Sequence, residues 1–302
     1  MWRKSGKRPV NSDKTLPLLA PPVFVVLWST GFVGAKFGLP YAEPFTFLSV
    51  RFYLAAAALL LLARLFGEPW KGPYDWSGAA LIGVLIHALY LGAVFQAIYW
   101  GMGAALSALI VSLQPVSTVL LARLLLGERM MPRQWFGMAL GFLGVALVVG
   151  RNVELGEAGL GAAALCFVGM FSASLASVLQ KRRSAEKRLA TDSAVQFIAA
   201  ATVCATLVFA FETREISPEP EFFAALAWMV IVLSLGAITI LYYMLRRGEA
   251  SRVASQFFLV PAVTALMAWA MFGETFGLFE LGGLVVAGVG VALVTLAPKK
   301  AR

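Results

Sequence analysis

Long apolar runs, separated by short charged or Gly- and Pro-containing segments, fill most of the chain. The runs fall at about residues 17–37, 44–66, 76–99, 103–126, 133–150, 158–180, 193–211, 222–245, 252–273 and 277–297. A helix that spans a bilayer needs about 20 mostly apolar residues, and each run is close to that length. The pattern therefore predicts an all-α integral membrane protein of ten transmembrane helices.

Composition agrees with this pattern. Of the 302 residues, 60% are hydrophobic and 14% are charged, whereas soluble domains average roughly 45–50% apolar and about 25% charged residues. The ten runs use nearly the whole length, so we expect residues 1–302 to form a single transmembrane domain with short basic tails. Cys166 and Cys204 both fall inside apolar runs, and we interpret them as small apolar side chains.

Lys and Arg residues alternate with the predicted spans. If the N-terminus is cytoplasmic, 21 of the 25 basic residues fall in cytoplasmic segments, as the positive-inside rule requires. Only Lys36, Arg151 and Arg214 would then be outside, and Arg51 would lie within the second span. The alternation predicts that both termini are cytoplasmic. It also explains the net charge of +9 without a nucleic-acid partner.

An internal repeat relates the two halves of the chain. Residues 115–148 align without a gap on residues 261–294, with 12 identities in 34 positions. Pro115 matches Pro261, and the pair Gly127-Glu128 matches Gly273-Glu274. Five predicted spans separate the two copies, so the copies have opposite orientations in the membrane. The sequence thus predicts two inverted five-helix repeats, at about 17–150 and 158–297, with a substrate site in a central cavity between them.

These motifs resemble a known family. The end of the first span, LWSTGFVGAK at residues 27–36, Arg51 in the second span, and the two elements from Pro115 to Glu128 and from Pro261 to Glu274 are similar to the drug/metabolite transporter superfamily, in its ten-span EamA-type branch. Within that branch the chain most resembles the aromatic amino acid exporters. The resemblance implies export of amino acids or other metabolites across a bacterial inner membrane. We expect no cofactor and no metal, and the oligomeric state is left open.

Polar and aromatic side chains near the middle of a span are the candidates for substrate binding, because they are costly in hydrocarbon. Trp28, His87, Gln114 and Ser234 occupy such positions, and Tyr90 shares a helix face with His87. With two further aromatic residues, the predicted substrate-binding set is Trp28, His87, Tyr90, Tyr99, Gln114, Phe171 and Ser234. A hydrogen bond from His87 to a neighbouring helix is the alternative to a substrate contact.

Other residues suggest structural or conformational roles. Pro115 and Pro261 each remove a backbone donor from a helix, and we predict either hinge and gating roles or static packing for them. Glycines in the fifth and tenth spans suit close helix approach; they are Gly137, Gly141, Gly144, Gly283, Gly288 and Gly290. Lys36 and Arg51 have either a structural role or attract a substrate carboxylate.

The sequence favours an exporter or facilitator of small, largely apolar metabolites, with aromatic amino acids as the favoured case. None of the 16 acidic residues falls in the central part of a predicted span, so we expect transport down the substrate's own gradient by alternating access. Two other transporter classes are disfavoured. A proton-driven multidrug antiporter would need a buried carboxylate, which the predicted spans do not offer. A carrier of anionic sugar nucleotides or phosphorylated metabolites would need several buried cations, and at most Lys36 and Arg51 are available.

Two further classes stay open as alternatives. An intramembrane enzyme is disfavoured because the single histidine cannot form an HExxH pair and because Ser172 and Ser174 do not lie in a GxSxG turn. We interpret these serines as interhelical hydrogen-bond donors. A purely structural or receptor role is the second alternative. It is disfavoured because inverted repeats indicate a function that involves both sides of the membrane.

Overall fold

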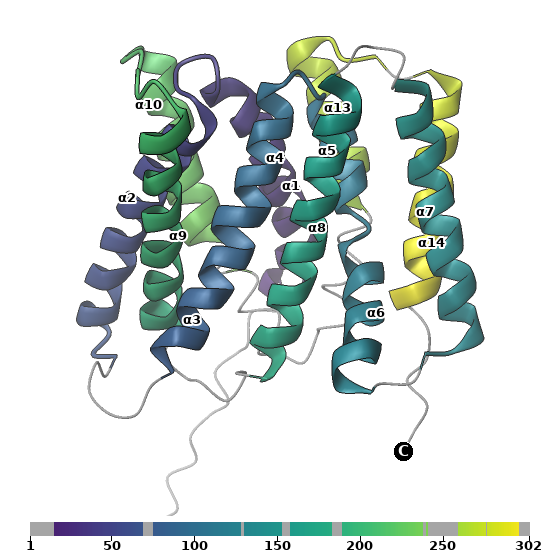
Figure 1. Cartoon of the computed structure of the whole chain (residues 1–302), viewed down its shortest axis with the longest axis horizontal. Helices are drawn as coiled ribbons and strands as arrows, with labels where there is room; N and C mark the ends of the chain where they lie inside the picture. The colour runs from purple at the N-terminus through teal and green to yellow at the C-terminus, as the bar shows by residue number, and fades with distance from the viewer. Residues whose placement is uncertain are drawn as a thin grey trace, which may run out of the picture.

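The computed structural model describes residues 15–68, 75–127, 130–152, 158–182, 189–237, 240, 259–275 and 277–295. These residues form an all-helical bundle (Figure 1). The first half consists of α1 (Thr15–Gly38), α2 (Pro44–Leu65), α3 (Trp76–Gly83), η1 (Val84–Leu89), α4 (Tyr90–Tyr99), α5 (Ala104–Val111), α6 (Gln114–Leu126) and α7 (Pro132–Asn152). The second half consists of α8 (Ala158–Arg182), α9 (Leu189–Phe211), α10 (Pro220–Ala227), η3 (Trp228–Ala237), α13 (Leu259–Phe272) and α14 (Leu278–Thr295).

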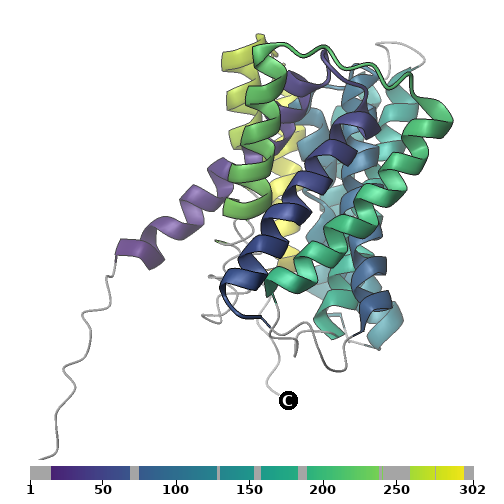
Figure 2. The same cartoon turned by 90° about the vertical axis from the view of Figure 1, so that its left-hand side faces the viewer.

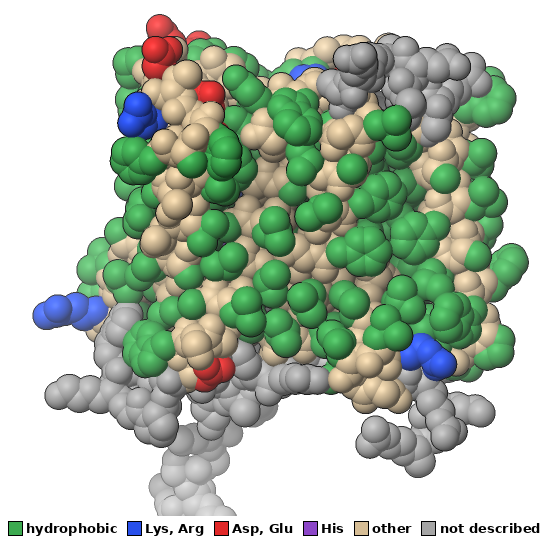
Figure 3. Space-filling view, in the orientation of Figure 1, with side chains coloured by type: hydrophobic (Ala, Val, Ile, Leu, Met, Phe, Trp, Pro, Cys, Tyr) green, Lys and Arg blue, Asp and Glu red, His purple; other side chains and the backbone are tan. Residues whose placement is uncertain are grey.

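The predicted membrane spans correspond to these helices. Within the described residues, nine helices of 18 to 24 residues are long and apolar enough to cross a membrane. The predicted ninth span, 252–273, is described only from Leu259 to Phe272 and is a shorter apolar helix there. Figure 3 shows hydrophobic side chains covering the lateral face, with the charged side chains at the two ends of the bundle. Such a surface requires hydrocarbon around it, so the chain is a multi-pass membrane protein.

Reciprocal capping of two helices shows the inverted relation of the halves. The backbone N–H and the hydroxyl of Thr46, at the start of α2, both donate to Glu212 Oε2 at 2.7 Å, just after α9 ends. At the other end of the bundle, the N–H and hydroxyl of Thr191, at the start of α9, donate to Glu68 Oε2 at 2.9 and 3.0 Å, just after α2 ends. Each helix therefore begins where the other ends. This antiparallel pair, α2 and α9, is seen in front in Figure 2, in dark blue and green.

Glycines in α7 and α14 repeat the same symmetry. A Cβ atom on Gly137 would lie 2.6 Å from the carbonyl oxygen of Gly290, and one on Gly144 would lie 2.7 Å from the carbonyl oxygen of Gly283. Gly137 is the repeat counterpart of Gly283, and Gly144 is that of Gly290, so the two contacts are copies of one another. The backbones of α7 and α14 touch because side chains are absent at these positions, as predicted. Gly288 is the exception, because no atom lies within 4 Å of its added Cβ.

An ion pair joins the halves at the end of the bundle where α1 ends and α2 begins, the end predicted to be outer. Lys36 Nζ of α1 lies 2.6 Å from Glu274 Oε1, just after α13, and 4.6 Å from the ring centre of Phe272. The same carboxylate oxygen accepts a hydrogen bond of 3.3 Å from the N–H of Ala104, at the start of α5. Lys36 therefore has a structural partner, which supports the first of its two predicted roles.

Among the residues that the structure describes, three spans depart from regular α-helix. The third span of each half contains a π-helical segment, η1 in the first half and η3 in the second. The fourth span is broken at Ser112 and Leu113, between α5 and α6. Pro115 follows the break and lacks the N–H that would reach the carbonyl of Val111 in a continuous helix. The hydroxyl of Ser174 in α8 lies 2.8 Å from the carbonyl oxygen of Met170 and 3.1 Å from that of Gln114, so α8 contacts the chain directly beside the break.

We predict that Gly290→Ala destabilises the bundle whereas Gly288→Ala, two residues away on the same helix, does not. The added methyl group at Gly290 meets backbone atoms of Gly137 and Gly141, which cannot move aside as a side chain does. We expect a loss of about 1–3 kcal/mol in the free energy of unfolding for Gly290→Ala. For Gly288→Ala we expect no loss and a gain of up to about 1 kcal/mol, since Ala favours helix over Gly.

Thermal unfolding of the two variants in detergent checks this prediction. Equal midpoints for both variants would contradict the close α7–α14 contact.

Candidate functional site

A cavity of about 140 Å³ lies between the two halves. Its walls come from α1, α2, η1 and α4 of the first half and from α9 and η3 of the second half. The aromatic lining residues are Trp28, Phe32, His87, Tyr90, Phe95 and Phe197. The polar lining residues are Arg51, Ser193, Gln196 and Ser234. The cavity thus combines a wall of aromatic and aliphatic side chains with a small number of polar groups, a composition typical of small-molecule sites.

Four of the predicted substrate-binding residues line this cavity together: Trp28, His87, Tyr90 and Ser234. The structure does not bring the other three to it. Tyr99 and Phe171 have 47% and 41% of their surfaces exposed, and Gln114 donates from Nε2 to Ser177 Oγ of α8 at 3.3 Å.

His87 packs within an aromatic cluster at the cavity wall. Its ring is stacked on Phe197 of α9, with centroids 4.2 Å apart and planes inclined by 21°. Phe52 of α2 lies 5.7 Å from His87 and 5.6 Å from Phe197. Because Phe52 and Phe197 belong to different halves, the cluster joins the halves at the cavity while leaving His87 among the lining residues.

The π-helical segments place the polar groups of this site. His87 lies in η1, and the hydroxyl of Ser172 in α8 donates to the carbonyl of Leu85 in the same segment at 2.8 Å. Ser234 lies in η3, and its hydroxyl donates to the carbonyl of Met229, five residues earlier, at 3.1 Å. Segments of this kind are frequently found at functional sites.

Arg51 is the charged group of the lining. It has 6% of its surface exposed, and its Nε and Nη2 both lie 3.3 Å from Ser234 Oγ. Its guanidinium carbon is 5.6 Å from the ring centre of Phe52. The hydroxyl hydrogen of Ser234 is used by Met229, so the oxygen of Ser234 is left to accept from Arg51. Arg51 thus lines the cavity and is bonded to the other half through Ser234, and both of its predicted roles stay predictions.

The contribution of α9 was missed at the sequence level. Ser193, Gln196 and Phe197 are spaced i, i+3 and i+4 and so share one face of the helix. Asp192, which has 4% of its surface exposed, accepts a hydrogen bond of 2.6 Å from Gln196 Nε2. The predicted span begins at residue 193 and so leaves out Asp192, whereas α9 begins at Leu189.

A signal for these residues does exist in the sequence. The spacing that relates Thr46 to Thr191 also relates Arg51 to Gln196 and Phe52 to Phe197. A comparison of the second and seventh spans at this spacing would have found this face of α9. The capping contacts of the two threonines confirm that the two spans are equivalent.

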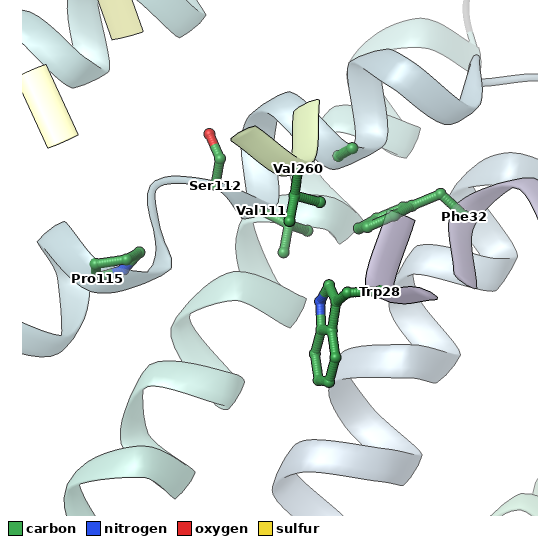
Figure 4. A pocket seen from close by; sticks show the side chains of 7 residues that line it. Trp28, Phe32, Val111, Ser112, Pro115 and Val260 are labelled. Carbon is green, nitrogen blue, oxygen red and sulfur yellow. The ribbon is translucent and has the colours of Figure 1, made fainter. Parts of the chain in front are cut away.

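A smaller pocket, of about 10 Å³, adjoins the break between α5 and α6. Trp28 and Phe32 line it together with Ser112 and Pro115, and Trp28 lines the large cavity as well. In Figure 4, Pro115 lies on the far side of this pocket from Phe32, with Val111 and Val260 between them. Pro261 is buried in the first turn of α13. The role of both prolines as hinges stays a prediction.

Comparisons with known proteins match each half of the chain to the same family. The model of the EamA-like transporter family matches residues 19–150 and again residues 160–296. The uncharacterized inner membrane transporter YedA of Escherichia coli is 25% identical over 272 residues, which cover 90% of this chain and 88% of that protein. An uncharacterized transporter of Archaeoglobus fulgidus is 29% identical and covers 94% of this chain and 98% of its own length.

Two further similarities concern function and fold. A protein of Salmonella typhimurium named "Probable amino-acid metabolite efflux pump" is 27% identical over 277 residues, 88% of this chain and 90% of its own. One solved crystal structure superposes with a TM-score of 0.66 at 18% identity, covering 96% of this chain and the whole of the other, which supports the fold.

We expect Pro115→Ala to lower the rate of transport severalfold while leaving the thermal midpoint of unfolding nearly unchanged. Alanine supplies the missing N–H and favours a continuous helix across Ser112 and Leu113, so a bending motion at the break becomes more costly. Initial rates and unfolding of the variant in detergent and liposomes test the hinge. An unchanged rate would show that Pro115 serves static packing only.

Proposed function

Because the chain belongs to the EamA-like transporter family, we propose that it exports small, largely apolar metabolites, most favourably aromatic amino acids, through the cavity between its halves. It is a membrane transporter and not an enzyme. In the proposed mechanism the two halves rock about the central site and expose it to each side in turn.

The aromatic lining of the cavity carries this proposal. Stacked and edge-on contacts between aromatic rings contribute about 0.5–1.5 kcal/mol beyond burial of their area. A cavity of about 150 Å³ is large enough to hold a benzene ring, and the cavity here has about 140 Å³. Trp28, Phe32, Tyr90 and Phe95 surround this volume. The ring of one substrate molecule is therefore of a size that can lie in this space against these side chains.

The names of similar proteins support the proposed direction of transport and the proposed location of the protein. The similar protein of Salmonella typhimurium is named an amino-acid metabolite efflux pump, and YedA is named an inner membrane transporter. By analogy we place this chain in a bacterial inner membrane with both termini in the cytoplasm, as the distribution of Lys and Arg predicts.

Cargo with several negative charges fits the cavity poorly. Sugar nucleotides and phosphorylated metabolites need several cations in the binding site, and Arg51 is the one cation of the described lining. Lys36 is held by Glu274 outside it. A substrate with a single negative charge matches the lining better.

Efflux of phenylalanine, tryptophan, tyrosine, alanine, lysine and glutamate from liposomes that contain the purified protein tests the proposal. We expect saturable efflux of the aromatic amino acids and little movement of lysine or glutamate. Trp28→Ala and His87→Ala remove stacking surface, so we expect up to about tenfold weaker aromatic substrate affinity in each.

Tyr99→Ala serves as the matched control, because Tyr99 is an aromatic residue of the same span as His87 but lies outside the cavity. Its efflux should equal that of the unmodified protein. Selective movement of lysine or glutamate, or loss of efflux in Tyr99→Ala alone, would contradict the aromatic site.

We further predict that efflux follows the substrate gradient and does not depend on a proton gradient. The alternative is proton coupling, for which Asp192 is the candidate because it is buried and bonded to Gln196 in the cavity wall. Efflux with and without a protonophore, in the unmodified protein and in Asp192→Asn, separates the two. A protonophore effect that disappears in Asp192→Asn would establish proton coupling instead.

A further inference from the structure

Arg51 carries a charge that the described protein does not neutralise. Within the part of the chain that the structure describes, the ion pair between two side chains is Lys36–Glu274, which lies away from the cavity lining. Arg51 is bonded to Ser234, a neutral hydroxyl whose own hydrogen is directed to Met229. A guanidinium offers five N–H donors, and one acceptor oxygen leaves several of them available to a ligand in the cavity.

Packing alone does not require a charge at this position. Gln196 occupies the equivalent position in the second half and lines the same cavity as a neutral side chain. An amide is therefore compatible with this place in the fold. Ionised residues within membrane spans are costly and generally mark a substrate or ion pathway, so the charge of Arg51 points to a ligand of opposite sign.

The group of the lining that faces the opposite end of a zwitterionic ligand is the amide of Gln196; the buried carboxylate of Asp192, to which this amide is bonded, is not among the lining residues. Gln196 Nε2 donates to Asp192 Oδ2 at 2.6 Å and lies 3.3 Å from Gln180 Oε1. A carboxylate only accepts hydrogen bonds, so this contact identifies the amide nitrogen of Gln196 and leaves its oxygen as the acceptor for another donor. A substrate ammonium group would find an amide oxygen here, whereas a substrate carboxylate would find a full positive charge at Arg51.

We propose that Arg51 binds the carboxylate of the substrate and that the substrates are aromatic monocarboxylates, in which the amino group is secondary. This inference rests on the proposed function, since it names the recognised group at the same site. The guanidinium fork matches a carboxylate in two parallel hydrogen bonds, while the ring of the substrate lies against the aromatic wall. Ser234 positions the guanidinium from the second half.

Three ligands that share a phenyl ring separate the two polar groups. L-phenylalanine has both groups, 3-phenylpropanoate has only the carboxylate, and L-phenylalaninamide has only the amine. Their binding to the purified protein in detergent is measured by isothermal titration, and their ability to compete with efflux of phenylalanine is measured in liposomes. We expect 3-phenylpropanoate to bind within a few-fold of phenylalanine and phenylalaninamide to bind at least about tenfold more weakly, the loss of one charge-assisted pair.

Variants of Arg51 test whether this preference depends on its charge. Arg51→Gln copies the residue of the other half, and we expect it to bind all three ligands equally weakly. Arg51→Lys keeps the charge without the fork, and we expect it to recover part of the preference for carboxylates. Arg64→Gln is the matched control, because Arg64 is exposed near the end of the same helix, and it should behave as the unmodified protein.

The outcomes separate this inference from the proposed function. Equal binding of phenylalanine and its amide by the unmodified protein, or an undiminished carboxylate preference in folded Arg51→Gln, overturns the role of Arg51 even if phenylalanine is exported. Arg51-dependent binding of 3-phenylpropanoate without any efflux of phenylalanine keeps the carboxylate site and removes amino acid export. If Arg51→Gln fails to fold, the three-ligand comparison in the unmodified protein and in Arg51→Lys still decides.

Discussion

The capping of α2 and α9 by each other's terminal glutamates is the interaction on which the central site depends. A helix start leaves backbone N–H groups without partners, and this deficit is severe near hydrocarbon. Glu212 satisfies the start of α2, and Glu68 satisfies the start of α9. The two helices are thereby fixed in antiparallel register, and this register brings Phe52 against Phe197. The same alignment brings Arg51 of α2 and Gln196 of α9 to the cavity lining.

A second fixed contact lies away from the cavity. The glycines of α7 and α14 bring two backbones together with no side chains between them. Neither helix contributes to the cavity wall. The structure thus separates a tightly packed pair of helices, which holds the halves together, from the elements that line the site, among which η1 and η3 are irregular.

Hydropathy and internal repetition predicted most of the architecture because both depend on features that the sequence shows directly. The length of each apolar run is set by the bilayer, and Pro115 and Pro261 mark the repeat without any knowledge of contacts. The glycines of the fifth and tenth spans suggested close helix approach in the same way, while the pairing of Gly137 with Gly290 and of Gly144 with Gly283 came from the structure. These predictions needed no information on how the helices are rotated.

The rotation of each helix about its axis explains why some of the predicted site residues line the cavity and others do not. Lipid and neighbouring helices are both apolar, so hydropathy does not distinguish a lipid-facing Phe171 from a cavity-facing Phe95. The π-helical segment η1 adds a residue to its turn and so changes the phase of the helix beyond it, which affects the direction of Tyr99. Arg51 and Ser234 were noticed from their polarity within predicted spans, but the contact between them, and the presence of Gln196 in the same lining, came only from the structure.

The difference between Arg51 and Gln196 has a consequence for how a carrier of this kind evolves and works. Two identical halves, inverted in the membrane, would present the same groups to a substrate arriving from either side, and the carrier would show equal apparent affinities in both directions. A guanidinium in one half and an amide in the other remove that equivalence. After a duplication event, a single substitution at this position is enough to give the two faces of the membrane different kinetics, without any change in the scaffold.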